Sequence, residues 1–187
     1  MAAKDNSDSL ILELLNSSSG KDAGFSMLVD KYSERLYWHI RHMILIHEDA
    51  DDILQNTWMK VYKNIKRFNG NSGLYTWLYR IATNESINLI NQKKRRISSS
   101  VAYKDAIKHK LQAEPWFEGD EIELQLQSAI ALLTDKQREV FILKYYEDKS
   151  YKEISELTGI SIGGLKAQYH HATKKIESII KRKTYSI

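Results

Sequence analysis

Apolar residues recur along this chain with the three-and-four spacing of amphipathic helices, and the alternation typical of strands is rare. Two stripes predict long helices from about residue 25 to 43 and from 53 to 65. They comprise Phe25, Leu28, Val29, Tyr32, Leu36, Ile40 and Met43, followed by Ile53, Trp58, Val61, Tyr62 and Ile65. A third helix is expected from about Leu74 to Gln92, leading into the basic run 93–96. The pattern predicts an all-α fold, with Trp58 and Trp77 on buried sides.

The periodic pattern stops near Ile97 and returns at Ile122. Between them the chain has a serine run, its single proline and the acidic patch at 114–121. This stretch is longer than an ordinary loop within a domain, which indicates a boundary. We therefore predict two small helical domains, 1–96 and 122–187, joined by a flexible linker at 97–121 that leaves room for short helical pieces.

Residues 150–176 have the pattern of a helix, a tight turn and a second helix. Ser150 and Glu153 form a predicted capping box, in which the hydroxyl and the carboxylate each satisfy a backbone amide at the helix start. Thr134 and Gln137 form another, one helix earlier. The C-terminal domain is therefore predicted to contain a helix-turn-helix.

The second helix of this pair has the features of a DNA-reading helix. Gly159 supplies the turn before it, and Ser161 can cap it. Its outward side is polar and basic, which together with a helix N-terminus favours phosphate, and Gln168 can reach a base edge. The alternative is a helical hairpin with a solvated basic face. Gly163 and Gly164 lower helix propensity; they either let backbone amides approach a phosphate or are tolerated at a frayed turn.

Composition and charge restrict the classes of function. The 187 residues are 42% hydrophobic and 28% charged, as in a soluble globular chain. A formal net charge of +4 is weak evidence for a polyanionic partner. No apolar run reaches the roughly 20 residues of a membrane span, and no secretory signal is expected. The absence of cysteine excludes disulfides and thiolate zinc sites, and is compatible with a reducing cytoplasm.

Three histidines in the first half of the chain invite a metal assignment. His39, His42 and His47 have no accompanying carboxylate set at ligand spacing, so an ordinary helix surface is expected for them. The sequence has no recognisable catalytic triad or phosphate-binding glycine loop. We therefore expect no catalytic residue, no metal and no cofactor.

Two blocks of the sequence resemble one protein family. The segment DADDILQNTWMKVY at 49–62 looks like the part of bacterial sigma factors that binds the clamp helices of RNA polymerase. It is followed by FNGNS at 68–72 and TWLYRIATN at 76–84, which are similar to the promoter-melting and −10-reading part of the extracytoplasmic-function (ECF) sigma factors. Residues 133–141 and 150–166 resemble the −35-reading domain of the same family.

The resemblance implies a sigma factor of the sigma-70 superfamily: a non-enzymatic subunit that binds core RNA polymerase and directs promoter-specific transcription initiation. Its implied partners are the beta-prime clamp helices and the beta flap of the polymerase, promoter DNA, and an anti-sigma factor that holds it inactive. The implied location is the bacterial cytoplasm, at the nucleoid when in holoenzyme, without membrane insertion. The alternatives are a free-standing helix-turn-helix regulator that binds duplex operator DNA, and an adaptor that binds a protein partner. The N-terminal block argues against both.

The resemblance also assigns residues to each contact. The polymerase-binding residues are expected to be Asp49, Asp51, Asp52, Gln55 and Asn56. The −10 and melting residues are expected to be Asn69, Asn71, Ser72, Tyr75, Arg80, Asn84, Asn88, Lys93, Lys94, Arg95 and Arg96. The −35 residues are expected to be Ser161, Gly163, Gly164, Lys166, Gln168, His170, His171 and Lys174.

Residue chemistry bears on these assignments independently. Acidic side chains repel DNA, so the cluster at 49–52 suits a protein partner or the positive end of its own helix dipole. Small polar residues in the loop 69–73 can hydrogen-bond an extruded base, and Arg80 with the basic run 93–96 offers a track for a single strand. A solvated helix end is the alternative for that run. Gly164 stands where the family commonly has threonine, and Gln168, His171 and Thr173 stand where arginine is common. DNA binding by the C-terminal module is therefore expected to be less electrostatic than usual in the family.

Overall fold

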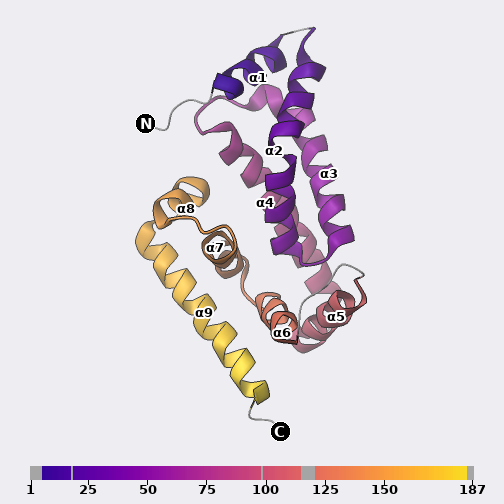
Figure 1. Cartoon of the computed structure of the whole chain (residues 1–187), viewed down its shortest axis with the longest axis vertical. Helices are drawn as coiled ribbons and strands as arrows, with labels where there is room; N and C mark the ends of the chain where they lie inside the picture. The colour runs from indigo at the N-terminus through magenta and orange to yellow at the C-terminus, as the bar shows by residue number, and fades with distance from the viewer. Residues whose placement is uncertain (1–5, 18, 98, 115–120, 185–187) are drawn as a thin grey trace.

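A computed structural model describes residues 6–17, 19–97, 99–114 and 121–184. These ranges are largely helical and contain no strand, so the predicted all-α fold is confirmed (Figure 1). The helices are α1 (Asn6–Asn16), α2 (Lys21–Ile44), α3 (His47–Asn64), α4 (Leu74–Arg96), α5 (Ser100–Ala113), α6 (Glu121–Ile130), α7 (Asp135–Tyr145), α8 (Tyr151–Thr158) and α9 (Ile162–Thr184), with a 3₁₀ turn η1 (Ile65–Arg67) after α3. None of the described helices is both long and apolar enough to cross a bilayer.

Helices α1 to α4 form the N-terminal module, a bundle built around the predicted apolar stripes. Leu28, Leu36 and Ile40 of α2 are completely buried, as are Val61 of α3 and Leu78 of α4. Helix α4 includes the basic run and ends at Arg96. Positive side chains are favourable in the last turn of a helix, where the backbone carbonyls are unpaired.

The hydrophobic pattern does not predict α1, which packs on the start of α2. Ile11 and Leu15 place their side chains in the core. The two helices approach closely at Gly24, where an added Cβ would lie 2.9 Å from the backbone nitrogen of Leu15. Tyr32 Oη then donates to Asp8 Oδ1 at 2.7 Å. A close approach at a glycine and polar contacts of Asp8 with Tyr32 and Lys31 therefore hold α1 on the bundle.

Most of the predicted linker at 97–121 is the single helix α5. Ser99 caps it, because the Ser99 hydroxyl accepts from the backbone N–H of Ala102 at 3.1 Å. Tyr103, Ile107 and Leu111 recur every four residues and are buried. Helix α5 packs against α6, so this part of the linker adds to the core. The rest of the linker, 115–120, lies outside the described residues.

Local signals define the helices of the C-terminal module, α6 to α9. Both predicted capping boxes are confirmed, at Thr134 with Gln137 and at Ser150 with Glu153. Gly159 ends α8 in the left-handed region, with a φ of 76° that favours glycine. The predicted helix-turn-helix is therefore formed by α8 and α9.

The C-terminal module packs against the N-terminal module (Figure 1). Helix α7 lies on α2, and α8 lies on α4; we call this contact the seam. Tyr79 Oη on α4 donates to Glu139 Oε1 on α7 at 3.0 Å. Arg80 Nε donates to the carbonyl of Leu157 on α8 at 3.1 Å. The two predicted domains thus share polar contacts in addition to the chain that joins them.

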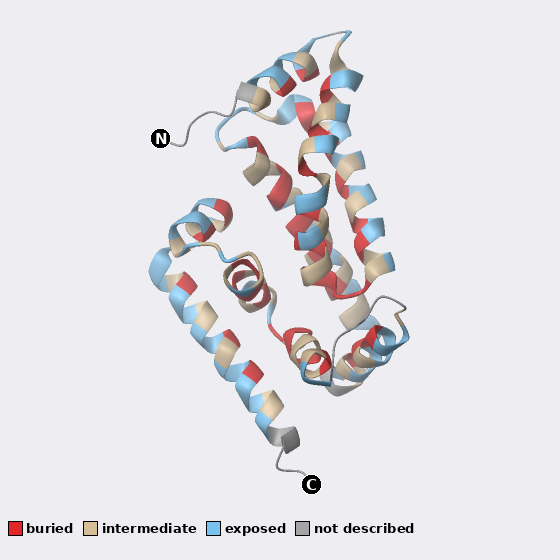
Figure 2. Cartoon of the chain, viewed as in Figure 1, coloured by how far each residue is buried: buried red, intermediate tan, exposed pale blue. Residues whose placement is uncertain are grey.

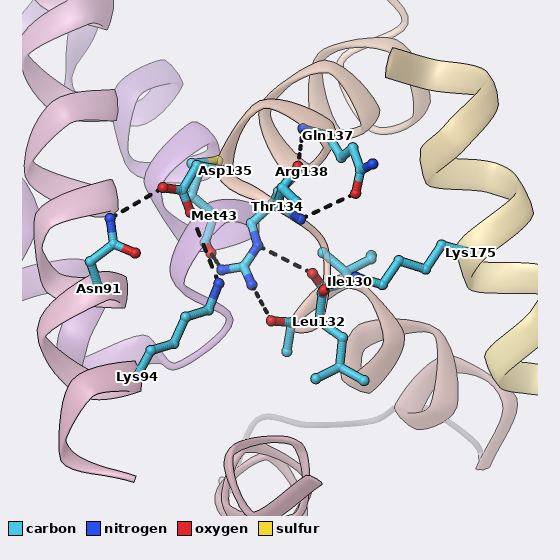
Figure 3. Close-up of polar contacts among 11 residues, drawn as sticks. Met43, Asn91, Lys94, Ile130, Leu132, Thr134, Asp135, Gln137, Arg138 and Lys175 are labelled. Carbon is cyan, nitrogen blue, oxygen red and sulfur yellow. Dashed lines mark hydrogen bonds and ion pairs between the residues drawn. The ribbon is translucent and has the colours of Figure 1, made fainter. Parts of the chain in front are cut away.

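Arg138 of α7 is a fully buried charge at the seam, with 1% of its surface exposed. Its guanidinium donates to three backbone carbonyls (Figure 3): Nε to Ile130 at 3.2 Å, Nη2 to Ala131 at 2.5 Å, and Nη1 to Met43 at 3.1 Å. The first two carbonyls lie at the end of α6 and the third lies in the last turn of α2. Arg138 therefore joins the C-terminal ends of two helices that belong to different modules.

Helix C-termini explain how a charge is tolerated there. The last four carbonyls of a helix have no partner within it and carry partial negative charge. Burial lowers the pKa of the Arg138 guanidinium, and the neighbouring Tyr103 and Asp135 oppose that shift. Asp135 also accepts from Asn91 Nδ2 at 3.1 Å and lies 3.9 Å from Lys94 Nζ (Figure 3). The site is a network of donors and acceptors from both modules.

Replacing Arg138 by lysine should lower the free energy of unfolding by about 2–4 kcal/mol. A lysine ammonium lacks the planar fork of donors, so some of the three carbonyls would lose their partner while a buried charge remains. Chemical denaturation followed by circular dichroism measures the change. Lys136→Ala, at an exposed position two residues earlier on α7, is the matched control and should shift stability by less than about 0.5 kcal/mol. Equal, small effects of both variants would contradict the role given to Arg138.

Candidate nucleic-acid and polymerase interfaces

The predicted −35 residues lie on the first four turns of α9 and at its cap. Ser161 caps the helix as predicted, with its hydroxyl accepting from the backbone N–H of Gly164 at 3.2 Å. Leu165, Ala172 and Ile176 form the buried side of α9. The opposite side is exposed (Figure 2). Its exposed members are Ser161, Gly163, Lys166, His170, His171 and Lys174, while Gly164 and Gln168 are half-buried.

The two glycines at the start of α9 have different surroundings. A Cβ on Gly163 would meet no atom within 4 Å. A Cβ on Gly164 would lie 3.1 Å from Ile160 Cγ2 and 3.3 Å from the hydroxyl of Ser161. Gly164 therefore accommodates the close turn before the helix and its cap, while Gly163 leaves backbone exposed at the helix N-terminus.

The predicted polymerase-binding residues lie along the first half of α3. Asp51, Asp52, Gln55 and Asn56 are exposed. Asp49 differs from them, because it is half-buried and paired with Lys93 of α4. Four of the five residues are thus available to a partner, and Asp49 also joins α3 to α4.

An apolar surface that the sequence does not reveal adjoins these residues. Met59 and Tyr62 are 51% and 38% exposed, although Tyr62 belongs to the apolar stripe that predicts α3. Phe25 packs against Tyr62, and together with Trp58 these side chains line a shallow pocket beside Gln55. Tyr62 Oη donates to Asp22 Oδ1 at 2.9 Å, which keeps the ring at the rim of the bundle. Tyr62 stands one position after Val61, which takes the buried place on this turn.

The predicted −10 residues divide between the loop before α4 and α4 itself. In the loop, Asn69 Oδ1 accepts from the backbone N–H of Asn71 at 3.1 Å, and Gly70 has a φ of 72°. This local hydrogen bond shapes a turn that leaves both asparagines exposed. Ser72, also in the loop, is half-buried. The predicted residues of α4 that are exposed are Arg80, Asn84, Asn88, Arg95 and Arg96.

Lys93, Lys94 and Tyr75, like Arg80, are predicted −10 residues that have partners within the chain. Lys93 is paired with Asp49, and Lys94 lies near Asp135. Tyr75 is half-buried beneath Arg35, whose guanidinium carbon lies 3.7 Å from the ring centroid. Burial raises the pKa of the Tyr75 hydroxyl to about 12, although Arg35 lowers it. Arg95 and Arg96 are therefore the exposed positive charges of the basic run.

The expectation of an ordinary helix surface is wrong for His39. This side chain has no exposed surface and lies at the seam. Its Nδ1 is 2.8 Å from Glu147 Oε1, and its Nε2 is 3.0 Å from Thr83 Oγ1. Burial raises the pKa of Glu147, but His39 and Lys149 outweigh burial and lower it to about 2. The described residues contain no group of three or more potential metal ligands. His39 forms a polar contact between the modules.

Two family models match the chain, one in each module. The model Sigma-70 region 2 matches residues 28–96, and Sigma-70, region 4 matches residues 123–176. The first range contains α3, α4 and most of α2; the second contains the helix-turn-helix. The two matches define a protein with the region 2 and region 4 architecture of the sigma-70 factors.

Known proteins give the same assignment. The ECF RNA polymerase sigma factor SigW of Bacillus subtilis is 31% identical over 166 residues, which cover 84% of this chain and 89% of SigW. The RNA polymerase sigma-H factor of Pseudomonas aeruginosa is 28% identical over 170 residues, covering 86% and 88%. This chain therefore belongs to the ECF sigma factors, and the resemblance seen in its two sequence blocks is confirmed.

Solved structures support the fold. CnrH, in a complex with the cytosolic domain of CnrY, matches with a TM-score of 0.62 and 19% identity, over 94% of this chain and 98% of that chain. The sigma factor RpoE of Bartonella quintana, in complex with the anti-sigma factor NepR, matches with a TM-score of 0.57 and 22% identity, over 84% and 96%. Each of these two matches covers both modules.

Alanine at the two glycines should have different effects on stability. Gly163→Ala should raise the free energy of unfolding by about 0.5 kcal/mol, because alanine favours the helix and the site is open. Gly164→Ala should gain less or lose stability, because its Cβ crowds Ile160 and the capping hydroxyl of Ser161. Thermal unfolding measures both, and each variant serves as the control for the other. A larger gain at Gly164 would contradict the crowding.

Proposed function

We propose that this sigma factor binds core RNA polymerase through α3, reads the −10 element with the loop 69–73 and α4, and reads the −35 element with α9. Nucleotide transfer is left to the polymerase, so the chain acts as a regulator without catalytic residues, metal or cofactor. The observation that carries the proposal is that one chain holds three exposed surfaces of different chemistry. They are an acid- and amide-rich α3, a row of asparagines and arginines on α4, and a basic, polar side of α9.

The acidic residues of α3 could bind a protein partner or could only interact favourably with the dipole of their own helix. The surroundings of α3 favour the protein partner. A helix dipole acts within the first turn, whereas Asp51, Asp52, Gln55 and Asn56 lie in the second and third turns of α3. Met59 adds exposed apolar surface next to them. Exposed apolar area rimmed by polar residues is typical of protein interaction sites. We assign this surface to the beta-prime clamp helices of the polymerase, and the C-terminal module to its beta flap.

The surface of α4 suits a single strand better than a duplex. Asn84 and Asn88 are one turn apart and can hydrogen-bond unpaired base edges, and Arg80 precedes them by one turn. Arg95 and Arg96 supply charge for the phosphates. The exposed amides of Asn69 and Asn71 suit an extruded base.

An anti-sigma factor is the remaining proposed partner. The solved relatives RpoE and CnrH were captured with NepR and with the cytosolic domain of CnrY. A protein that covers surfaces of both modules would keep this chain from the polymerase. We place the chain in the bacterial cytoplasm, and at the nucleoid when it is part of holoenzyme.

Charge reversal on α3 should weaken polymerase binding selectively. Asp51→Lys with Asp52→Lys is expected to reduce affinity for core RNA polymerase by about tenfold or more, because two favourable charges become unfavourable. Fluorescence anisotropy of the labelled protein with sigma-free core measures this. Asp30→Lys with Glu34→Lys makes the same charge change at exposed positions of α2 and should leave affinity within about twofold. Equal losses in both double variants would contradict the assignment of α3.

Removing two side chains of α9 should impair use of the upstream element alone. Lys166→Ala with Gln168→Ala is expected to reduce initiation about tenfold at promoters selected from a library with core polymerase, and to spare core binding. Lys110→Ala with Gln112→Ala removes the same residue types at the same spacing on the exposed side of α5 and serves as the control.

The same assay tests the function as a whole. A protein that never initiates with core, yet binds duplex operators without it, would be a free-standing regulator and would contradict the proposal. Impaired core binding in the α9 variant would contradict the division of labour between the modules.

A further inference from the structure

A small hollow lies where the end of α4 and the start of α5 meet the end of α6. Its volume is about 270 Å³, and its lining consists of Lys94, Ile97, Ser99, Tyr103, Ala131 and Leu132. Pockets for drug-sized ligands are larger, from roughly 300 Å³ upward. The hollow is therefore sized for a small ion or a single chemical group.

Positive side chains from three helices come together at this hollow. Lys94 of α4 lines it, with its Nζ 5.9 Å from the centroid of the Tyr103 ring. Lys175 of α9 reaches its edge, because Lys175 Nζ donates to the carbonyl of Leu132 at 2.5 Å. Figure 3 shows both lysines extending from α4 and α9 towards the region of Arg138 on α7. The hollow is therefore bordered by two ammonium groups, with a buried guanidinium close to them.

Carboxylates balance only part of this charge. Asp135 lies 3.9 Å from Lys94 Nζ, and its charge also acts on Arg138. Asp49 of α3 is already paired with Lys93, the residue before Lys94. The cations around the hollow are thus in surplus over the acids that act on them.

This surplus affects the pKa of the Lys94 ammonium. Burial lowers the pKa, and repulsion from Arg138 and Lys175 adds to that shift. Asp135 opposes the shift without cancelling it. A nearby opposite charge favours the charged form of an ionisable group. An anion in the hollow would therefore relieve the repulsion among the three cations.

Hydrogen-bond donors remain for such an anion. An ammonium group has three N–H donors, and Lys175 uses one of them on Leu132. Lys94 Nζ lies farther from Asp135 than a hydrogen bond reaches. Ser99 adds a hydroxyl at the start of α5, where the positive end of the helix dipole also favours an anion.

The carbonyls at the end of α6 do not oppose an anion, because they already have donors. Arg138 donates to the carbonyls of Ile130 and Ala131, and Lys175 donates to that of Leu132. The partial negative charge of this helix end is thus covered by cations, whose remaining charge faces outward from it.

We propose that this hollow binds a free phosphate or diphosphate ion, held by Lys94 and Lys175 in front of the Arg138 charge. Phosphate oxygens are strong acceptors with negative charge, and they suit ammonium groups as point charges. The bound ion would join α4 of one module to α9 of the other and would stabilise their packing. Lys94 also belongs to the basic run proposed for the −10 strand, so a strand phosphate is the other source of the same chemistry.

Lysine footprinting on the unaltered chain tests the site directly. Acetylation rates are measured by mass spectrometry with and without pyrophosphate, at constant ionic strength. Pyrophosphate should slow acetylation of Lys94 and Lys175 by about fivefold or more, because a bound anion covers the ammonium groups and holds them protonated. Lys66 and Lys152 are exposed lysines away from the hollow, and their rates should change by less than about twofold.

A double variant measures the contribution of the two lysines. Lys94→Gln with Lys175→Gln should bind pyrophosphate at least about tenfold more weakly in isothermal titration calorimetry. Lys66→Gln with Lys152→Gln removes the same charge at exposed positions and should keep the affinity within about twofold. Circular dichroism verifies both folds, and the footprint of the unaltered chain remains an independent test if the first variant does not fold.

A short randomised single-stranded DNA, used in place of pyrophosphate, separates the two sources of phosphate. Protection of Lys94 and Lys175 by pyrophosphate and not by the strand supports a site for a free ion. Protection by the strand alone would overturn the proposal and assign both lysines to nucleic acid. Equal protection of all four lysines, or unchanged affinity of the Lys94 and Lys175 variant, would also overturn it. Initiation with core polymerase enters none of these measurements, so the proposed function is tested separately.

Discussion

One guanidinium sets how the two halves of this molecule meet. Arg138 lies where α2 and α6 both end, so carbonyls from the ends of two helices converge on one planar group of donors. An apolar side chain would remove the donor that Arg138 supplies to each of these carbonyls. Because Arg138 is the fourth residue of α7, its position fixes α7 on α2. The polar contacts of Glu139 and Glu147 follow from that placement, as does the packing of α8 on α4.

Signals that act over a few residues were readable in the sequence, and those that join distant residues were not. The capping boxes at 134–137 and 150–153 and the turn at Gly159 involve neighbours in the chain, so their residue types suffice to predict them. The exposed sides of α3 and α9 follow from helical spacing in the same way. The all-α fold was predictable for this reason, as were most of the exposed candidate residues.

The seam depends on pairs of residues that are far apart in sequence, such as His39 with Glu147, and no local sequence pattern predicts such pairs. A weak signal existed at Arg138, which precedes Phe141 and Ile142 by three and four positions and therefore shares their buried side of α7. The same limitation applies to Tyr75. Helical spacing left its side ambiguous, and the packing of Arg35 and of the other module decided its burial.

Helix α5 connects the two modules and is much shorter as a helix than it would be as an extended chain. Its 14 residues span about 21 Å as a helix and up to roughly 48 Å when extended. Glu114, the residue that follows α5, accepts from the backbone N–H of His47 at 2.6 Å and from Arg41 at 2.8 Å. Helix α5 itself packs on α6. Helix α5 is thus attached to both modules. The distance by which the two modules can move apart depends on which of these attachments breaks. Unwinding α5 would more than double its span, so the buried stripe of Tyr103, Ile107 and Leu111 keeps the connection between the two modules short.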